Sequence, residues 1–185
     1  REFDGYVAQY QGDGLVVYFG YPVAHEDDAQ RAVRAGLGIL AALPHLNSQL
    51  QQIVKDIRNF PLQLRIGIHT GMTVVGEIGA GKRRELTALG DTPNITSRLQ
   101  GIAKANTVVI SATTYQLIRG FFECVSLGPQ ELKGVSAPIL AYQVLNDSKV
   151  QNRFEAVLTK GLTPMVGREQ ELALLLERWE RVKKG

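Results

Sequence analysis

Cysteine, long apolar runs and blocks of like charge are all scarce in this sequence. Its single cysteine, Cys124, excludes an intrachain disulfide and a cysteine-based metal cluster. No apolar run approaches the ~20 residues that a membrane-spanning helix needs. Lys and Arg number 21 against 18 Asp and Glu, and the resulting net charge of +3 is spread along the chain. We therefore expect a cytoplasmic protein that binds neither membranes nor nucleic acid.

The composition is typical of a globular protein, with 44% hydrophobic and 21% charged residues among 185. This length has room for one domain and the start of another. Residues 1–146 alternate β-rich and helical patterns, which predicts a mixed α+β domain. Residues 147–163 are polar and irregular, as a linker would be. Residues 164–185 carry leucines at helical spacing, and we expect them to begin a second domain.

The first β-rich region is a predicted hairpin with an aspartate in its turn. Aromatic and β-branched residues at Tyr6–Gln11 and Leu15–Phe19 flank the tripeptide Gly12-Asp13-Gly14. Because glycines permit a tight reversal, Asp13 is expected at the hairpin tip. An Asp-Gly pair is ordinary turn chemistry, and a carboxylate on a rigid hairpin is also a suitable ligand for a hard divalent cation. The hairpin alone leaves both interpretations open.

Two helices and a pair of strands are predicted next. Acidic residues at positions 26–28 suit the start of a helix, and Pro44 is expected to end it. Leu46 to Ile57 has a weaker helical periodicity, which predicts a second helix ended by Pro61. Leu62–Gly71 alternates like a strand with one buried face, and Met72–Ile78 is its expected antiparallel partner.

Gly76 to Lys82 has the spacing of a phosphate-binding loop, followed by a basic stretch. The residue after Lys82 is Arg83, where such a loop has Ser or Thr, and a strand rather than a helix is predicted to follow. The stretch is therefore interpreted as a loop at a hairpin tip.

The second half of the domain is predicted to alternate short strands and helices. A helix from Gly90 to about Ala105 would bury Ile95, Leu99 and Ile102. Asn94 and Arg98 lie four residues apart and share a neighbouring face of that helix. The other predicted elements are strands at Glu85–Leu89, Thr107–Ser111, Phe121–Leu127 and Ile139–Val144, a helix at Ala112–Arg119 and a turn at Leu132–Val135.

Several separated motifs together resemble the class III adenylyl/guanylyl cyclase catalytic domain. They are Leu64–Gly71, Val74–Gly79 and Leu89–Leu99, with Gly12-Asp13-Gly14 and Ala29–Val33 in matching order and spacing. The resemblance covers about residues 1–145. It implies a ferredoxin-like or palm-type mixed sheet with flanking helices. It also implies that the family's first strand and helix would precede Arg1, so we expect the chain to be an N-terminally truncated piece.

The resemblance implies that ATP is converted to cyclic AMP and pyrophosphate at the interface with a second cyclase domain. The family uses two divalent metal ions per site, Mg²⁺ or Mn²⁺, and Asp13 would correspond to the second of two metal-binding aspartates. The first of them would lie upstream of Arg1. We therefore expect the chain by itself to be inactive.

The resemblance also assigns roles to five further residues. Asn94 would orient the ribose, Arg98 would stabilise charge on the transferring phosphate, and Lys133 would contact the β- and γ-phosphates. Thr87 corresponds to an adenine-recognising position. Gln9 stands where the family usually has Lys or Glu, and this departure still permits adenine recognition because an amide both donates and accepts.

Two alternative interpretations remain. The domain is a degenerate cyclase that binds nucleotide or regulates a neighbouring domain, or it is a palm-type diguanylate cyclase. The second lacks the Gly-Gly-Asp/Glu-Glu-Phe signature and leaves Asn94 and Arg98 unexplained. Met165–Glu169 is similar to the entry segment of ATPase domains that follow such cyclase domains in bacterial regulators. A missing first strand would also leave sheet edges uncovered, which predicts dimerisation or strand swapping of this chain.

Overall fold

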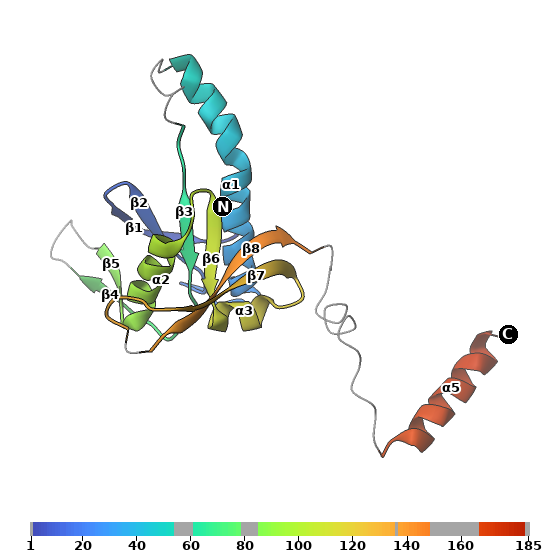
Figure 1. The fold of residues 1–185 in the computed structure, drawn as a ribbon. Helices are drawn as coiled ribbons and strands as arrows, with labels where there is room; N and C mark the ends of the chain where they lie inside the picture. The colour runs from blue at the N-terminus through green and yellow to red at the C-terminus, as the bar shows by residue number, and fades with distance from the viewer. Residues whose placement is uncertain (1, 54–60, 79–84, 136, 149–166, 184–185) are drawn as a thin grey trace.

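The computed structural model describes residues 2–53, 61–78, 85–135, 137–148 and 167–183 (Figure 1). Within these ranges, no helix has both the length and the apolarity needed to cross a membrane. The elements in chain order are β1 (Tyr6–Gln11), β2 (Gly14–Tyr18), α1 (Asp28–Ile53), β3 (Arg65–Ile68), β4 (Val74–Ile78), β5 (Glu85–Leu89), α2 (Asp91–Ile102), β6 (Thr107–Ser111), α3 (Ala112–Ile118), β7 (Phe122–Gln130), β8 (Ile139–Asp147) and α5 (Glu169–Lys183).

A four-stranded sheet in the order β3-β6-β8-β7 forms the centre of the fold. β3 runs parallel to β6, whereas β8 is antiparallel to both β6 and β7. The hairpin β1-β2 and the pair β4-β5 form two further two-stranded sheets. The predicted mixed α+β class, with sheets and flanking helices, is thus confirmed.

Helices cover both faces of the four-stranded sheet. Successive side chains of a strand point to opposite faces, and the two apolar clusters divide β6 in this way. Val108 and Ile110 pack in one cluster with Val33 of α1. Val109, which lies between them, packs in the other cluster with Leu99 of α2. The first face is therefore covered by α1 and α3 and the second by α2 (Figure 1).

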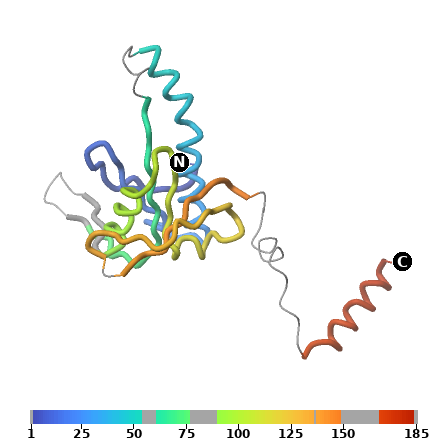
Figure 2. The backbone as a smooth tube through the Cα atoms, in the orientation of Figure 1, coloured from blue at the N-terminus to red at the C-terminus, as the bar shows by residue number. Residues whose placement is uncertain are grey.

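Helix α1 continues through Pro44 to Ile53, so the prediction that this proline ends the helix is wrong. An internal proline costs a helix about 3 kcal/mol, because it lacks a backbone N–H and crowds the preceding turn. A tertiary contact supports the helix beyond it. The Asn47 side chain accepts from the Leu62 N–H at 2.9 Å and donates to the Leu62 carbonyl at 3.1 Å. Figure 2 shows this end of α1 beside the segment that leads into β3.

The predicted pairing of Met72–Ile78 with the preceding strand is also wrong. β4 pairs antiparallel with β5, and β3 takes β6 as its parallel partner. Alternation of apolar and polar residues shows that a strand has a buried face, but it does not specify which strand completes the ladder. The predicted loop at 79–84 and the predicted helix end at Ile57 lie outside the described residues.

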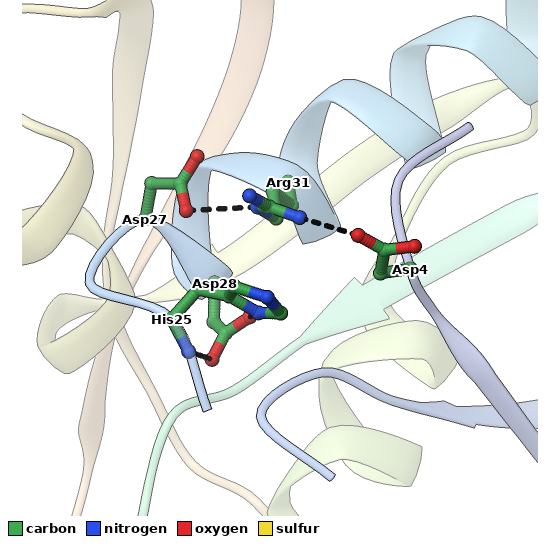
Figure 3. Close-up of polar contacts among 5 residues, drawn as sticks. All are labelled: Asp4, His25, Asp27, Asp28 and Arg31. Atoms are coloured by element: carbon green, nitrogen blue, oxygen red, sulfur yellow. Dashed lines mark hydrogen bonds and ion pairs between the residues drawn. The ribbon is translucent and has the colours of Figure 1, made fainter. Parts of the chain in front are cut away.

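Ion pairs and hydrogen bonds connect the segment before β1 to the start of α1 (Figure 3). Arg31 donates to Asp27 at 2.8 Å and to Asp4 at 2.7 Å. Partial burial alone would raise the pKa of Asp27, but the hydrogen bond and the charge of Arg31 hold that pKa below its usual range. The Asp28 carboxylate accepts from the His25 backbone N–H at 2.7 Å and contacts the His25 ring at 3.2 Å. These bonds fix where α1 begins.

Cys124 lies on β7, where it packs half-buried against the cluster under α1 and α3. Burial raises the pKa of its thiol to about 11, because a thiolate would be poorly solvated there. The side chain therefore remains a neutral thiol at physiological pH.

The C-terminal helix predicted from the leucine spacing is present as α5, Glu169–Lys183. None of its side chains is buried. Its exposed apolar residues include Leu172, Leu175, Leu176, Trp179 and Val182.

Candidate active site

The hairpin β1-β2 carries Asp13 at its tip, as the sequence predicted. Gln11 and Gly14 are the last paired residues, so Gly12 and Asp13 form the turn. Gly12 has a φ of 61°, a left-handed conformation that glycine adopts without strain. The Asp13 side chain is exposed, and a short turn between paired strands limits its freedom to move.

Gln9 lies on β1 next to an irregularity in the hairpin. The register shifts between Val7 and Gln9, and Gln9 then lies opposite Val16. The Gln9 side chain is half-buried, and its amide oxygen accepts a hydrogen bond from Nε2 of Gln11 at 3.1 Å. The amide oxygen of Gln9 is therefore engaged within the hairpin itself.

Thr87 lies in β5, opposite Gly76 of β4. For Thr87 the structure describes the backbone and not the side chain. β5 contacts both β1 and α2, so the strands that carry Gln9 and Thr87 are neighbours.

Helix α2 presents Asn94 and Arg98 to solvent. Both side chains are exposed, whereas Leu99 is fully buried and Ile95 packs against the same cluster. The i, i+4 spacing places Asn94 and Arg98 above one another on the helix surface. An amide and a guanidinium in this arrangement can bind the hydroxyl and phosphate groups of one ligand.

The position of α2 depends on an unusually close approach to β3. A Cβ atom on Gly67 would lie 2.5 Å from the Thr96 carbonyl oxygen and would also overlap the backbone of Gln100. Nothing larger than glycine fits at this crossing without displacing the helix. Gly67 therefore sets the depth at which α2, with Asn94 and Arg98, lies on the sheet.

Lys133 lies in the predicted turn between β7 and β8. The Val135 N–H donates to the Leu132 carbonyl at 3.0 Å, and Gly134 has a φ of 82°. Leu132 is buried in the same apolar cluster as Leu99 of α2, which anchors the turn beside that helix. Lys133 is exposed and lines an open hollow of about 440 Å³. An ammonium group there is accessible to an anionic ligand.

The predicted residues thus lie on neighbouring elements, and within the described part of the chain Lys133 lines an open hollow. Contacts link β1 to β5, β5 to α2 and, through Leu132, α2 to the Lys133 turn. A second hollow, of about 590 Å³, lies between α1 and strands β6 and β8, and its lining includes none of the predicted site residues. The candidate site is therefore an open surface.

The described residues do not fit a complete two-metal site. Among them, no group of three His, Cys, Asp or Glu side chains could hold a metal ion. Divalent cations such as Mg²⁺ require several oxygen ligands, and Asp13 supplies a single carboxylate. The described part of the chain therefore offers one possible ligand of such a site.

The sequence did not predict a polar cluster at the carboxyl ends of β3 and β6. The Nδ1 atom of His69 lies 2.8 Å from the Ser111 hydroxyl, and the Thr70 hydroxyl lies 3.0 Å from that of Thr114. Burial lowers the pKa of His69. In the sequence, the signal for this cluster is that polar residues follow two buried strands directly. This signal points to a cluster only once β3 and β6 are known to be parallel neighbours.

Comparison with known proteins identifies related catalytic domains. The family model described as the adenylate and guanylate cyclase catalytic domain matches residues 2–146. Adenylate cyclase 1 of Rhizobium meliloti is 34% identical over 155 residues, which are 83% of this chain and 23% of that protein. The chain thus spans less than a quarter of that relative's length.

Two solved structures share this fold, one of an adenylyl cyclase and one of a guanylate cyclase domain. The adenylyl cyclase CyaB from P. aeruginosa has a TM-score of 0.68 at 34% identity, covering 80% of this chain and 75% of that one. The guanylate cyclase domain of RhGC from Catenaria anguillulae, in complex with GTP, also has a TM-score of 0.68, at 28% identity and the same coverage.

Proposed function

The chain belongs to the adenylate and guanylate cyclase catalytic domain family, and we propose that it is the catalytic domain of an adenylyl cyclase. In this reaction the 3′-oxygen of ATP attacks the α-phosphorus. A new 3′-O–P bond forms, the bond between the α-phosphorus and the bridging oxygen of pyrophosphate breaks, and the hydroxyl proton is released to solvent. The products are cyclic AMP and pyrophosphate.

The observation that carries the proposal is the exposed pair on α2 beside the Lys133 turn. Asn94 would hold the ribose so that its 3′-oxygen faces the α-phosphorus. Arg98 would bind the α-phosphate oxygens, where a guanidinium opposes the negative charge of the transition state. Lys133 would bind the departing β- and γ-phosphates as a mobile point charge. Catalysis by these residues would consist of positioning and charge stabilisation.

Adenine is the proposed base. A Thr87 hydroxyl can accept from the adenine 6-amino group, and an amide N–H of Gln9 can donate to adenine N1. Relatives named for both nucleotides make a direct comparison of ATP and GTP necessary.

A second cyclase domain would complete the open site. The elements around it expose large apolar side chains, among them Tyr10 of β1 at 81% and Met72 before β4 at 96%. Exposed apolar surface is typical of protein interfaces where such side chains adjoin. The exposed residues nearby also include Val7, Leu15 and Val74. The pairing would place the Asp13 carboxylate where it could contribute to a site for Mg²⁺ or Mn²⁺.

The remainder of the chain would connect this domain to another. We interpret 147–163 as a linker and α5 as the first helix of an ATPase domain. The exposed leucines of α5 support this arrangement, since an apolar helix face is normally buried against further chain.

Gln9 favours a second candidate function, a nucleotide-binding domain without turnover. The family usually has a charged residue at this position, and here the amide is half-buried and bonded to Gln11. Such a domain would bind ATP without converting it, and the presence of bound ATP would regulate the adjacent domain.

The test is Arg98→Ala in the full-length protein, with Ser97→Ala as the matched control on the adjacent exposed position of α2. Loss of a charge-stabilising donor should lower kcat with ATP by about 10²–10³-fold, while Ser97→Ala should stay within about twofold. Turnover of ATP and GTP is measured for each. Undiminished activity in Arg98→Ala would refute the assigned role. ATP binding without any product would favour the second candidate.

A further inference from the structure

Four polar side chains form a hydrogen-bonded chain at the carboxyl ends of the parallel strands β3 and β6. From one end to the other they are Thr70, Thr114, Ser111 and His69, with separations of 3.0, 3.2 and 2.8 Å. Ser111 and Thr114 are almost completely buried, at 1% and 0% exposure. Buried hydroxyl groups lose several possible partners, so a fully connected arrangement such as this one has a specific geometry.

The protonation state of His69 determines which of the four side chains donates and which accepts in each hydrogen bond. Burial lowers the pKa of His69, so the neutral ring is the dominant form near pH 7. When its proton lies on Nε2, the Nδ1 atom accepts from the Ser111 hydroxyl. The Ser111 oxygen in turn accepts from the Thr114 backbone N–H at 3.3 Å. Thr114 then donates to Ser111 and accepts from Thr70, and every group has a complementary partner.

These four hydrogen-bonded side chains fix the short segment His69–Met72 against the sheet. That segment in turn contacts the start of α2. The Thr92 hydroxyl donates to the Met72 carbonyl at 2.8 Å. A Cβ on Gly71 would lie 2.6 Å from the Thr92 hydroxyl and 3.1 Å from Nε2 of His69, so the imidazole, the glycine and the helix are in close contact.

The start of α2 depends on this contact more than most helix starts do. Its N-cap is Gly90, with a φ of 128° and no side chain to bond the first free N–H groups. The Thr92 bond to Met72 satisfies none of those N–H groups, but it ties the side chain of the first turn to the segment before β4. Asn94 and Arg98 follow within the next two turns.

We propose that His69 is a positioning residue for Asn94 and Arg98. Acting through Ser111, Gly71 and Thr92, it sets the place of the first turn of α2 relative to β3 and β6. The inference rests on the proposed function, because it concerns how that site is aligned. A misplacement of about 1 Å in a reacting group can cost about 10²-fold in rate, so alignment at this distance from the ligand affects turnover.

The test compares two amide replacements of the same ring. In His69→Asn the amide occupies the place of Nδ1 and can still accept from Ser111. In His69→Gln the amide reaches the place of Nε2 and leaves Ser111 without its partner. Thr107→Val is the control, since it removes a hydroxyl bond of 2.8 Å to the Lys104 carbonyl at the opposite end of the same strand, β6.

Turnover and amide hydrogen exchange are measured on the full-length variants. We expect His69→Gln to lower kcat at least tenfold with little change in KM, and to speed exchange at the amides of residues 94–97, the first that bond within α2. His69→Asn should restore kcat to within about threefold of the natural protein, and Thr107→Val should leave both readouts unchanged. Equal effects of the Asn and Gln variants would overturn the inference, as would unaltered exchange in α2.

The exchange measurement separates this inference from the proposed function. If the natural protein forms no cyclic nucleotide, the proposed function fails. Faster exchange confined to α2 and the His69–Met72 segment in His69→Gln would still support the positioning role. If the natural protein is active and His69→Gln changes neither exchange nor kcat, only the positioning role fails.

Discussion

The two faces of the four-stranded sheet are covered in different ways. Under α1 and α3 the strands contribute large side chains, and the buried cluster comprises Val33, Val108, Ile110, Ile118, Phe121, Phe122 and Val144. Under α2 the buried cluster is smaller and comprises Leu99, Ala103, Val109, Leu132 and Ala141. Where α2 crosses β3, the strand residue that meets the helix backbone is Gly67.

The first face therefore contributes mainly to the stability of the fold, and the second mainly to the placement of α2. Interdigitated side chains on the first face bury much apolar surface, yet they leave a helix some freedom to shift as rotamers adjust. A helix backbone resting on a glycine has almost no such freedom in depth. The helix that carries Asn94 and Arg98 is the one fixed by backbone contact, as a site that requires exact placement would need.

The largest expected effects come from cutting into each cluster, with Ile110→Ala on the first face and Leu99→Ala on the second. Both side chains are fully buried, so each truncation should lower the free energy of unfolding by about 2–5 kcal/mol. Chemical denaturation measures that loss. At a temperature where both variants remain folded, Leu99→Ala should reduce kcat several-fold more than Ile110→Ala. Equal losses of activity would abolish the distinction between the faces.

A smaller effect is expected from Gly67→Ala. The added methyl group meets the backbone of α2, and overpacking of this kind costs about 1–3 kcal/mol. Since the helix must move outward, activity should fall by more than the loss of stability explains. Gly101→Ala is the control within α2, where a Cβ would meet nothing within 4 Å. It should instead stabilise the helix by up to about 1 kcal/mol, measured by thermal denaturation.

The smallest expected effect concerns the charged start of α1. The pKa of Asp27 is lower in the folded chain than its ordinary value of 3.8. Such a carboxyl stabilises the fold above that value and ceases to do so as the pH falls through the lower, folded value. Asp27→Asn should therefore lower the thermal midpoint slightly at pH 7, and the difference should shrink on acidification below pH 3.8. A difference that persists unchanged at low pH would contradict this assignment.

Local patterns in the sequence predicted the individual elements well. The strands Tyr6–Gln11 and Thr107–Ser111 have their predicted bounds, and Leu99 is buried between Ile95 and Ile102 as the helical spacing indicated. These features depend on side-chain periodicity within a few residues. The placement of Asp13, Asn94 and Lys133 on a turn, a helix and a second turn depends on equally local chemistry.

Features that depend on distant parts of the chain could not be predicted. Pro44 stays helical where the Asn47 side chain binds Leu62, 15 residues further along the chain. The contact between His69 and Ser111 joins residues 42 apart, and it exists because β3 and β6 are parallel neighbours. Gly67 is informative only once α2 is known to cross it. In each case the decisive partner is set by the tertiary fold.

The buried thiol of β7 has a practical consequence for following α2 directly. Reagents that label cysteine react with the thiolate, and with a pKa of about 11 Cys124 supplies very little of it near neutral pH. In the unpaired domain, a cysteine introduced by Met72→Cys would be highly exposed, at the residue whose carbonyl accepts from Thr92. A fluorophore or spin label would then attach there selectively. Such a label would report on the start of α2 without prior replacement of Cys124.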